Sequence, residues 1–275
     1  MAQSDPCDVC SWKKIEPRSF GYKSHVKIFY CVSDHGVWSI GDDVILKERS
    51  HKFSSYEARN IRYIQQHTTI PVPEIIHEWV EGDRYYLIMK RIPGVTLEKA
   101  WPTMSDTDKE CVAKQTAACL AQLRKLTSDR IETLEGEPVQ EAFLFDDQLW
   151  ETLAKELENV PEDLRRRLRR NMPSSQPYTY THSDLTTCNI MVKDGQLTGI
   201  IDWEGSAFFP SWWQSTSLRI GLGPDDFAWK RLLAEYVEPY KEGEDFWANR
   251  FRLERYPDLD SQGFEVVERL RIKDL

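Results

Sequence analysis

The feature that most constrains the fold is a hairpin pattern in the second half of the chain. Two apolar runs, residues 190–192 and 197–201, flank a turn that contains Asp-Gly. An Asp-Gly turn between apolar runs predicts two antiparallel strands. Such a hairpin would bring Asn189 and Asp202 to the same end, with Asp184 on the loop just before it. Two carboxylates and an amide gathered there favour a magnesium-bound phosphate and a hydroxyl nucleophile.

Composition indicates an ordinary globular protein with one large domain or two lobes. The 275 residues are 40% hydrophobic and 29% charged, which excludes a disordered chain. The formal net charge of −9 argues against a nucleic-acid partner, because phosphate binding needs clustered cations. One basic run, residues 165–170, follows Leu164 and surrounds Leu168. This spacing favours the solvated face of a helix, with an anionic contact as the alternative.

The sequence predicts a cytoplasmic protein without a membrane segment. The first residues lack the apolar region of a secretory signal, and no apolar run approaches the length of a membrane span. The six cysteines are scattered, and only Cys7 and Cys10 form a CxxC pair. Because no second pair or suitably spaced histidines follow, we expect incidental cysteines there instead of zinc ligands. Free thiols favour a reducing compartment, and we expect a monomer or a weak dimer.

Alternating patterns predict a small antiparallel lobe over residues 26–92, after an N-terminal extension over residues 1–25. The expected strands and one helix, capped by Ser54 or Ser55, cover residues 27–32, 36–40, 44–47, 54–67, 75–80 and 85–89. Lys47 ends an apolar strand, where a lysine is costly without a partner. Glu57 projects from the buried stripe of the helix that carries Ile61 and Ile64, so it can supply that partner. An ordinary lysine at a strand end is the alternative.

The remainder, residues 93–275, predicts a mainly helical lobe that carries the hairpin. A long helix begins after Ser105, which with Asp108 forms a capping-box pattern. The expected helices are 105–126, 147–157, 162–172, 227–240 and 246–256. The predicted fold class is therefore α+β with two lobes, and a cleft between two lobes is a common place for a small-molecule site.

Together these motifs resemble the aminoglycoside phosphotransferase and choline kinase-like family, within its fungal phosphotransferase branch. The motifs that carry the resemblance are HSDLTTCN at 182–189, IIDWE at 200–204, IPVP at 70–73, MKRIPG at 89–94, and Pro210 followed by Trp212-Trp213. The resemblance covers residues 36 to 220 and implies a protein-kinase-like fold. It implies an ATP- and Mg²⁺-dependent kinase that phosphorylates a hydroxyl of a small molecule.

The resemblance also implies roles for single residues. Asp184 would accept or orient the acceptor hydroxyl, while His182 would brace the loop, and Asn189 and Asp202 would hold Mg²⁺. Capping of a loop is the alternative for Asp184, and turn chemistry is the alternative for the two metal ligands.

For the nucleotide, the resemblance implies that Lys47, positioned by Glu57, contacts the α- and β-phosphates of ATP. Met89 and Arg91 would offer backbone groups to adenine, and an apolar strand end is the alternative there. For Glu204 three roles stay open: contact with a second metal ion, contact with the acceptor, and capping of the next segment.

The sequence departs from the family pattern in three places. Ser183 stands where many members have glycine, and a serine is strained if φ is positive there. No glycine-rich loop is present, and Ser33-Asp34-His35-Gly36 is the single turn-like candidate in its place. No activation segment follows Asp202, which disfavours a protein substrate and so a protein kinase. A catalytically impaired kinase-fold protein that acts as a binding partner, or a different reaction on the same scaffold, stays as the alternative.

Overall fold

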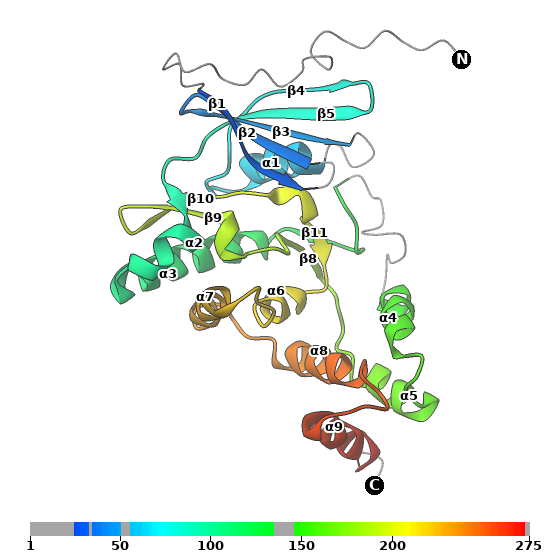
Figure 1. Ribbon diagram of the computed structural model, residues 1–275. Coiled ribbons are helices and arrows are strands. Elements are labelled where there is room, and N and C mark those ends of the chain that lie inside the picture. Colours follow the sequence, from blue (N-terminus) through cyan, green and yellow to red (C-terminus); the bar gives the residue numbers. More distant parts are fainter. Residues whose placement is uncertain (1–24, 33–34, 51–55, 135–145, 273–275) are drawn as a thin grey trace, which may run out of the picture.

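The computed structural model describes residues 25–32, 35–50, 56–134 and 146–272, with a β-sheet at one end and helices at the other (Figure 1). Of the predicted N-terminal extension, residues 1–24, with Cys7 and Cys10, lie outside the described residues. Ser33-Asp34 and the predicted cap at Ser54 or Ser55 also lie outside them. The sheet end consists of β1 (Val26–Val32), β2 (His35–Ile40), β3 (Val44–Ser50), α1 (Tyr56–His67), β4 (Ile75–Glu81) and β5 (Arg84–Lys90).

The five strands form one antiparallel sheet in the order β1-β2-β3-β5-β4. This confirms the predicted antiparallel meander and hairpin. β3 is longer than the predicted run because its polar end keeps pairing with β5, with Arg49 opposite Tyr85. Alternate residues of β5, including Tyr85 and Leu87, are buried in the core together with Ile61 and Ile64 of α1. The helix is thereby fixed, and Glu57 with it.

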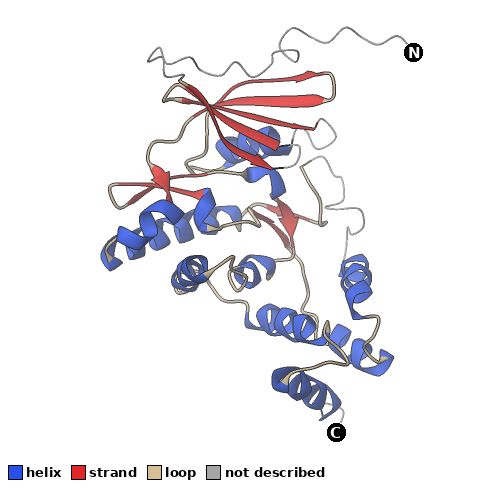
Figure 2. Cartoon of the chain, viewed as in Figure 1, coloured by secondary structure: helices blue, strands red, loops and turns tan. Residues whose placement is uncertain are grey.

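The second part is mainly helical, as predicted (Figure 2). Its helices are α2 (Leu97–Ala100), α3 (Asp106–Leu123), α4 (Asp146–Ala154), α5 (Glu162–Arg170), α6 (Trp213–Ser217), α7 (Pro224–Ala234), α8 (Lys241–Leu253) and α9 (Ser261–Ile272). The cap of α3 is present, because the Ser105 hydroxyl accepts from the Asp108 N–H at 3.1 Å. None of the helices in the described ranges is long and apolar enough to cross a membrane.

Two helical predictions were wrong in extent, and three helices were missed. The predicted helix 227–240 stops at Ala234 in α7, because a helix through Pro239 would bring its ring against the carbonyl of Glu235, four residues before it. The next helix, α8, starts at Lys241, earlier than predicted. The missed helices are α2 and α6, which have four and five residues, and α9.

Two three-stranded sheets lie within the helical part. The predicted hairpin is confirmed as β9 (Ile190–Lys193) and β10 (Gln196–Ile200), and β9 also pairs with β6 (Val95–Thr96). Asp194 and Gly195 both have positive φ in its turn, as an Asp-Gly hairpin requires. The other sheet, with β8 (Tyr178–Thr181) between β7 (Thr127–Ser128) and β11 (Ala207–Phe209), was not predicted. β8 leads directly into residues 182–189, which we call the 182–189 loop.

Candidate active site

The hairpin brings the two ends of the 182–202 segment together, as the sequence predicts. The N–H of Ile201 donates to the carbonyl of Asn189 at 3.0 Å, so Asp202 follows directly beside it. Asn189 is buried, and its amide nitrogen donates to the carboxylate of Asp184 at 2.9 Å and to its carbonyl at 3.0 Å. Asp184 itself is exposed. The loop therefore presents one carboxylate to solvent while an amide fixes it from behind.

His182 holds this loop in place through two hydrogen bonds of its ring. Its side chain is fully buried, and its Nδ1 accepts from the N–H of Asp184 at 3.3 Å. Its Nε2 lies 2.9 Å from the carbonyl of Ile201, which it can reach only as a donor. Both contacts fit a neutral ring with its proton on Nε2, and burial lowers the pKa of His182 further below neutrality. The ring thus joins the loop to the end of the hairpin.

Two residues of the site have backbone conformations that favour glycine. Ser183 has φ 65°, the condition under which a serine is strained at this position, and Asp202 has φ 66°. The Ser183 hydroxyl lies 2.7 Å from the carbonyls of both His182 and Gly205. These contacts hold the strained residue in place and tie the 182–189 loop to the turn after Asp202.

Lys47 connects the sheet to the hairpin. Its Nζ lies 2.7 Å from Glu57 Oε1 and 2.8 Å from Asp202 Oδ1, a residue 155 positions away. The predicted pairing of Lys47 with Glu57 is therefore present. Burial opposes the charge of Lys47, but the carboxylates of Glu57 and Asp202 outweigh it and raise its pKa. Burial also acts against ionisation of Asp202, yet Lys47 lowers the pKa of that carboxyl below its usual range.

Arg49 is a member of the site that the sequence interpretation missed. It lies two residues beyond Lys47 on β3, so both side chains point to the same face of the sheet. Its guanidinium is buried, with Nη2 3.3 Å from Glu57 Oε2 and Nη1 in an ion pair with Glu204. The period-two spacing from Lys47 was the available signal. Glu204, left open by the sequence, contacts a cation of the sheet.

The turn that carries Glu204 is also fixed to α1. The side-chain amide of Asn60 donates to the carbonyls of Trp203 at 2.6 Å and Ser206 at 3.1 Å. Asn60 is buried, so these bonds are shielded from water. Together with Arg49, they hold the segment after Asp202 against the helix that carries Glu57.

Carboxylate oxygens of Glu57, Asp202 and Glu204 lie within 4.8 Å of one another. Such a cluster resembles a cation site by composition alone. Lys47 and Arg49 already pair with all three groups, however, so the positive charge there comes from the protein itself. We call these five residues the ion-paired cluster. It differs from the predicted magnesium ligands, Asn189 and Asp202, in that Asp202 alone belongs to both sets.

Comparison with known proteins agrees with this architecture. The model of the phosphotransferase enzyme family matches residues 40–210. The chain belongs to this family. Among curated proteins, none matches.

Solved structures with a similar fold include aminoglycoside phosphotransferases and a macrolide phosphotransferase. The ternary complex of APH(2'')-IIa with streptomycin and ATP is 17% identical, covers 90% of each chain and has a TM-score of 0.56. A thermostable mutant of aminoglycoside phosphotransferase APH(4)-Ia is 14% identical, covers 92% of this chain and 93% of that one, and has a TM-score of 0.58. Macrolide 2'-phosphotransferase MphH from Brachybacterium faecium is 14% identical, covers 83% and 84%, and has a TM-score of 0.53. The predicted two-lobed kinase-like fold is thus confirmed.

The region predicted to contact adenine lies where β5 leaves the sheet. Met89 is buried between Ile45 of β3 and Ile75 of β4. The N–H of Arg91 donates to the carbonyl of Asp43 at 2.7 Å, so the sheet already uses that donor. Contact of Met89 and Arg91 with adenine stays a prediction, as does the lobe boundary at residue 92.

Proposed function

We propose that this member of the phosphotransferase enzyme family transfers the γ-phosphate of ATP to a hydroxyl group of a small molecule, with Mg²⁺. The observation that carries the proposal is the 2.8 Å contact between Lys47 and Asp202. It joins a cation of the sheet to the hairpin beside the exposed Asp184. A phosphate bound at this point would contact Lys47 of the sheet and lie beside the carboxylate of Asp184. The proposed metal ligands, Asn189 and Asp202, lie at the same place.

Asp184 accepts the proton of the acceptor hydroxyl in this proposal. The hydroxyl oxygen forms a bond to the γ-phosphorus while the bond from that phosphorus to the β–γ bridging oxygen breaks, and ADP leaves. Asp184 suits the role because it is exposed while Asn189 holds its carboxylate at 2.9 Å. A fixed and accessible carboxylate is what proton acceptance from a bound hydroxyl requires.

Asn189 and Asp202 fit a magnesium ion by donor chemistry. The lowered pKa of Asp202 keeps it ionised, and Lys47 occupies one of its two oxygens. The Asn189 amide turns its nitrogen to Asp184, which leaves the amide oxygen as the donor for a metal. Mg²⁺ prefers such oxygen ligands. When bound, the ion would offset the negative charge of the ATP phosphates.

Lys47 contacts the α- and β-phosphates in this scheme, and Glu57 keeps its ammonium in position. Glu57 is 2% exposed, and Arg49 holds its second oxygen, so the carboxylate cannot follow Lys47 toward a ligand. The nucleotides named in the neighbouring structures support ATP as the donor, since they include ATP and AMP-PNP complexes. Their acceptors differ, with streptomycin, gentamicin, hygromycin B and macrolides among them, so they do not identify the acceptor here.

The alternative is a kinase-fold protein that binds a partner without catalysis. A wide separation of Lys47 from Glu57 would favour it, and the observed 2.7 Å contact weighs against it. Titration calorimetry with ATP in the presence and absence of Mg²⁺ tests the proposal directly. We expect Mg²⁺-dependent binding and ADP release with an acceptor. Absence of ATP binding in Mg²⁺ would refute the proposal.

A further inference from the structure

The segment between α6 and the first turns of α7 exposes three large apolar side chains, Ile220, Leu222 and Phe227, which we call the apolar wall. Their exposed fractions are 45%, 80% and 51%. The ring of Phe227 lies against Gly221, since a Cβ at that glycine would be 2.7 Å from the ring. Single exposed apolar residues are normal, but a group of them on a soluble protein marks a ligand or partner surface.

The apolar wall is fixed to the 182–189 loop by one buried carboxylate. Asp226 accepts from the N–H of Thr187 at 2.9 Å with one oxygen and from the N–H of Leu222 at 3.0 Å with the other. The indole of Trp229 donates to the carbonyl of Leu185 at 3.0 Å. Leu185 and Thr187 follow Asp184 by one and three residues. The wall is therefore held at the border of the proposed reaction site.

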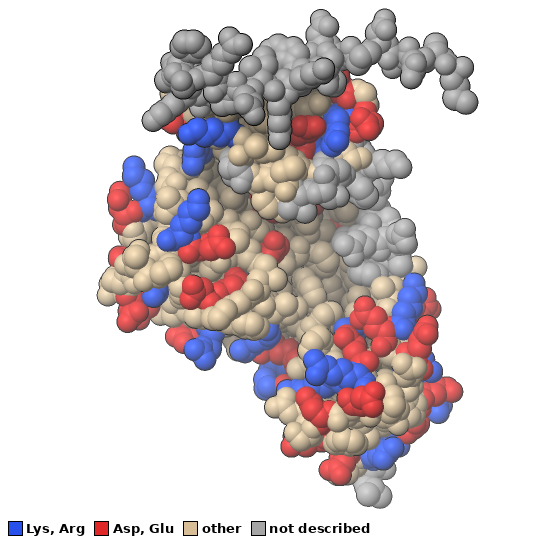
Figure 3. All heavy atoms as spheres, viewed as in Figure 1, with Lys and Arg blue, Asp and Glu red and all other residues tan. Residues whose placement is uncertain are grey.

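The charges beneath the wall neutralise each other. Lys230 lies 3.3 Å from Asp226 and donates to the carbonyl of Ile220 at 2.6 Å. Both charged side chains are buried, so neither presents a charge at the surface of the wall; Asp225 beside them is exposed. Figure 3 shows one face of the molecule, on which charged side chains of both signs surround largely uncharged surface.

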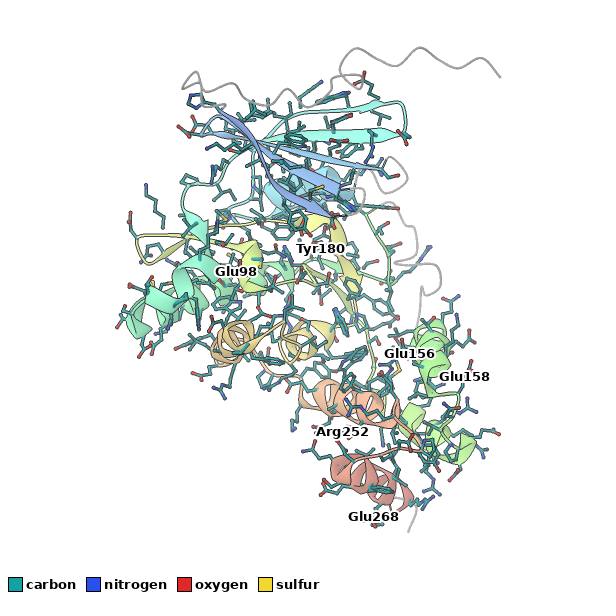
Figure 4. All side chains as sticks on the ribbon, in the orientation of Figure 1. Glu98, Glu156, Glu158, Tyr180, Arg252 and Glu268 are labelled. Carbon is teal, nitrogen blue, oxygen red and sulfur yellow. The ribbon has the colours of Figure 1, made fainter. Side chains whose placement is uncertain are left out.

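A second helix, α2, also borders the loop and carries a carboxylate. Glu98, labelled in Figure 4, is on α2, which contacts residues 187–189 of the loop. The border of the site is thus polar on the α2 side and apolar on the α7 side.

We propose that the apolar wall binds the non-reacting body of the acceptor, so that the acceptor is a hydroxyl compound with a largely apolar skeleton. This inference rests on the proposed phosphotransferase function. A polycationic aminosugar would lose hydration against Leu222 and Phe227 and gain no counter-charge from the paired Asp226 and Lys230. An apolar body gains there, because removal of hydrocarbon from water is favourable. Its hydroxyl remains free to reach Asp184.

The test compares two acceptor classes on the full chain with ATP and Mg²⁺. One class is the series of alkyl glucosides from methyl to hexyl, and the other is streptomycin, gentamicin and hygromycin B. ADP release reports transfer. We expect transfer to the alkyl glucosides, with KM falling about threefold for each methylene that the wall covers. Leu222→Ser and Phe227→Ser should raise this KM about tenfold. The matched control is Phe264→Ser on α9, where the side chain is 57% exposed and lies outside the wall.

Three results would overturn the inference. They are transfer to the polycationic class alone, an unchanged acceptor KM in both wall variants, and a dimer that these variants dissociate, which would make a second copy the occupant. The slow hydrolysis of ATP without an acceptor is measured as well, because it distinguishes failure of this inference from failure of the proposed function. If that hydrolysis persists while no alkyl glucoside is phosphorylated, the wall proposal is wrong. If wild-type protein neither binds nor hydrolyses ATP, the phosphotransferase proposal itself is wrong.

Discussion

The ion-paired cluster and the 182–189 loop lie next to each other but are built in opposite ways. In the cluster, two cations and three carboxylates from β3, α1 and residues 202–204 neutralise one another, with Glu57 almost fully buried. In the loop, Asp184 is exposed and forms no ion pair with the residues that the structure describes; an amide and a histidine hold it. One region is fixed by charge, and the other is fixed by hydrogen bonds so that its charge stays accessible.

Because of this difference, substitutions in the ion-paired cluster and at Asp184 should affect different properties of the protein. A change in the cluster removes one partner of buried charges, so it affects stability and nucleotide binding together. A change at Asp184 removes an exposed group, so it affects transfer and leaves the fold intact.

Asp184→Ala should abolish transfer and spare the nucleotide site. Loss of a proton acceptor lowers kcat by roughly 10²- to 10⁴-fold, while ATP affinity and the unfolding midpoint should stay close to wild type. Calorimetry, a thermal melt and an ADP-release assay measure the three quantities. Asp194→Asn, in the turn of the same hairpin, is the matched control and should keep full activity. Unchanged turnover in Asp184→Ala would remove Asp184 from the mechanism.

Lys47→Met should lower both the stability of the fold and the affinity for ATP. It leaves Glu57 and Asp202 without their shared cation, so we expect a loss of about 3 kcal/mol in the free energy of unfolding. The KM for ATP should also rise by at least tenfold, because the phosphates lose a contact. Urea unfolding and ATP kinetics measure both. The double variant Lys47→Met, Glu57→Gln should recover part of the stability but none of the ATP affinity. Equal recovery of the two would contradict a role of Lys47 at the phosphates.

Arg49→Met tests a positioning residue of the cluster. Arg49 holds Glu57 and Glu204, so its removal should loosen the carboxylate that orients Lys47. We expect a rise of about fivefold to tenfold in the KM for ATP with a smaller change in kcat, since one buried charged partner is lost. Arg49→Lys should restore one of the two contacts and part of the affinity. Lys90→Met, in an exposed pair with Glu74, is the control. A merely structural Arg49 would lower the melting temperature without this split between KM and kcat.

The sequence predicted the parts of the site whose signal is local. The hairpin was predictable because its turn contains Asp-Gly, and the Lys47–Glu57 pair because each residue lies on an apolar pattern where a charge needs a partner. Arg49 was missed because β3 continues through a polar stretch that pairing with β5 extends, and no apolar pattern marks it. The contact of Lys47 with Asp202 and the short strands β8 and β11 depend on tertiary neighbours, which a local pattern does not encode.

The pH dependence of stability should report the buried His182. Burial lowers its pKa in the folded state, so below the usual value of about 6.5 the unfolded chain binds a proton that the folded chain refuses. Stability should therefore be complete above that value and fall as the pH drops below it. The expected slope is at most about 1.4 kcal/mol per pH unit. Urea unfolding between pH 7.5 and 5.5 measures it, and His182→Asn should flatten this slope. An equal slope in wild type and variant would show that His182 does not titrate on unfolding.

Substitutions at Ser183 should give the smallest effects and separate backbone strain from hydrogen bonding. Ser183→Gly relieves the left-handed conformation at φ 65° but loses the hydroxyl contacts with His182 and Gly205, two effects of about 1 kcal/mol each that oppose one another. Ser183→Ala keeps the strain and loses the same contacts. The alanine variant should therefore be about 1 kcal/mol less stable than the glycine variant by urea unfolding, while both retain ATP binding because Ser183 lies outside the ion-paired cluster. Equal stability of the two variants would mean that the backbone at this position relaxes when the serine is replaced.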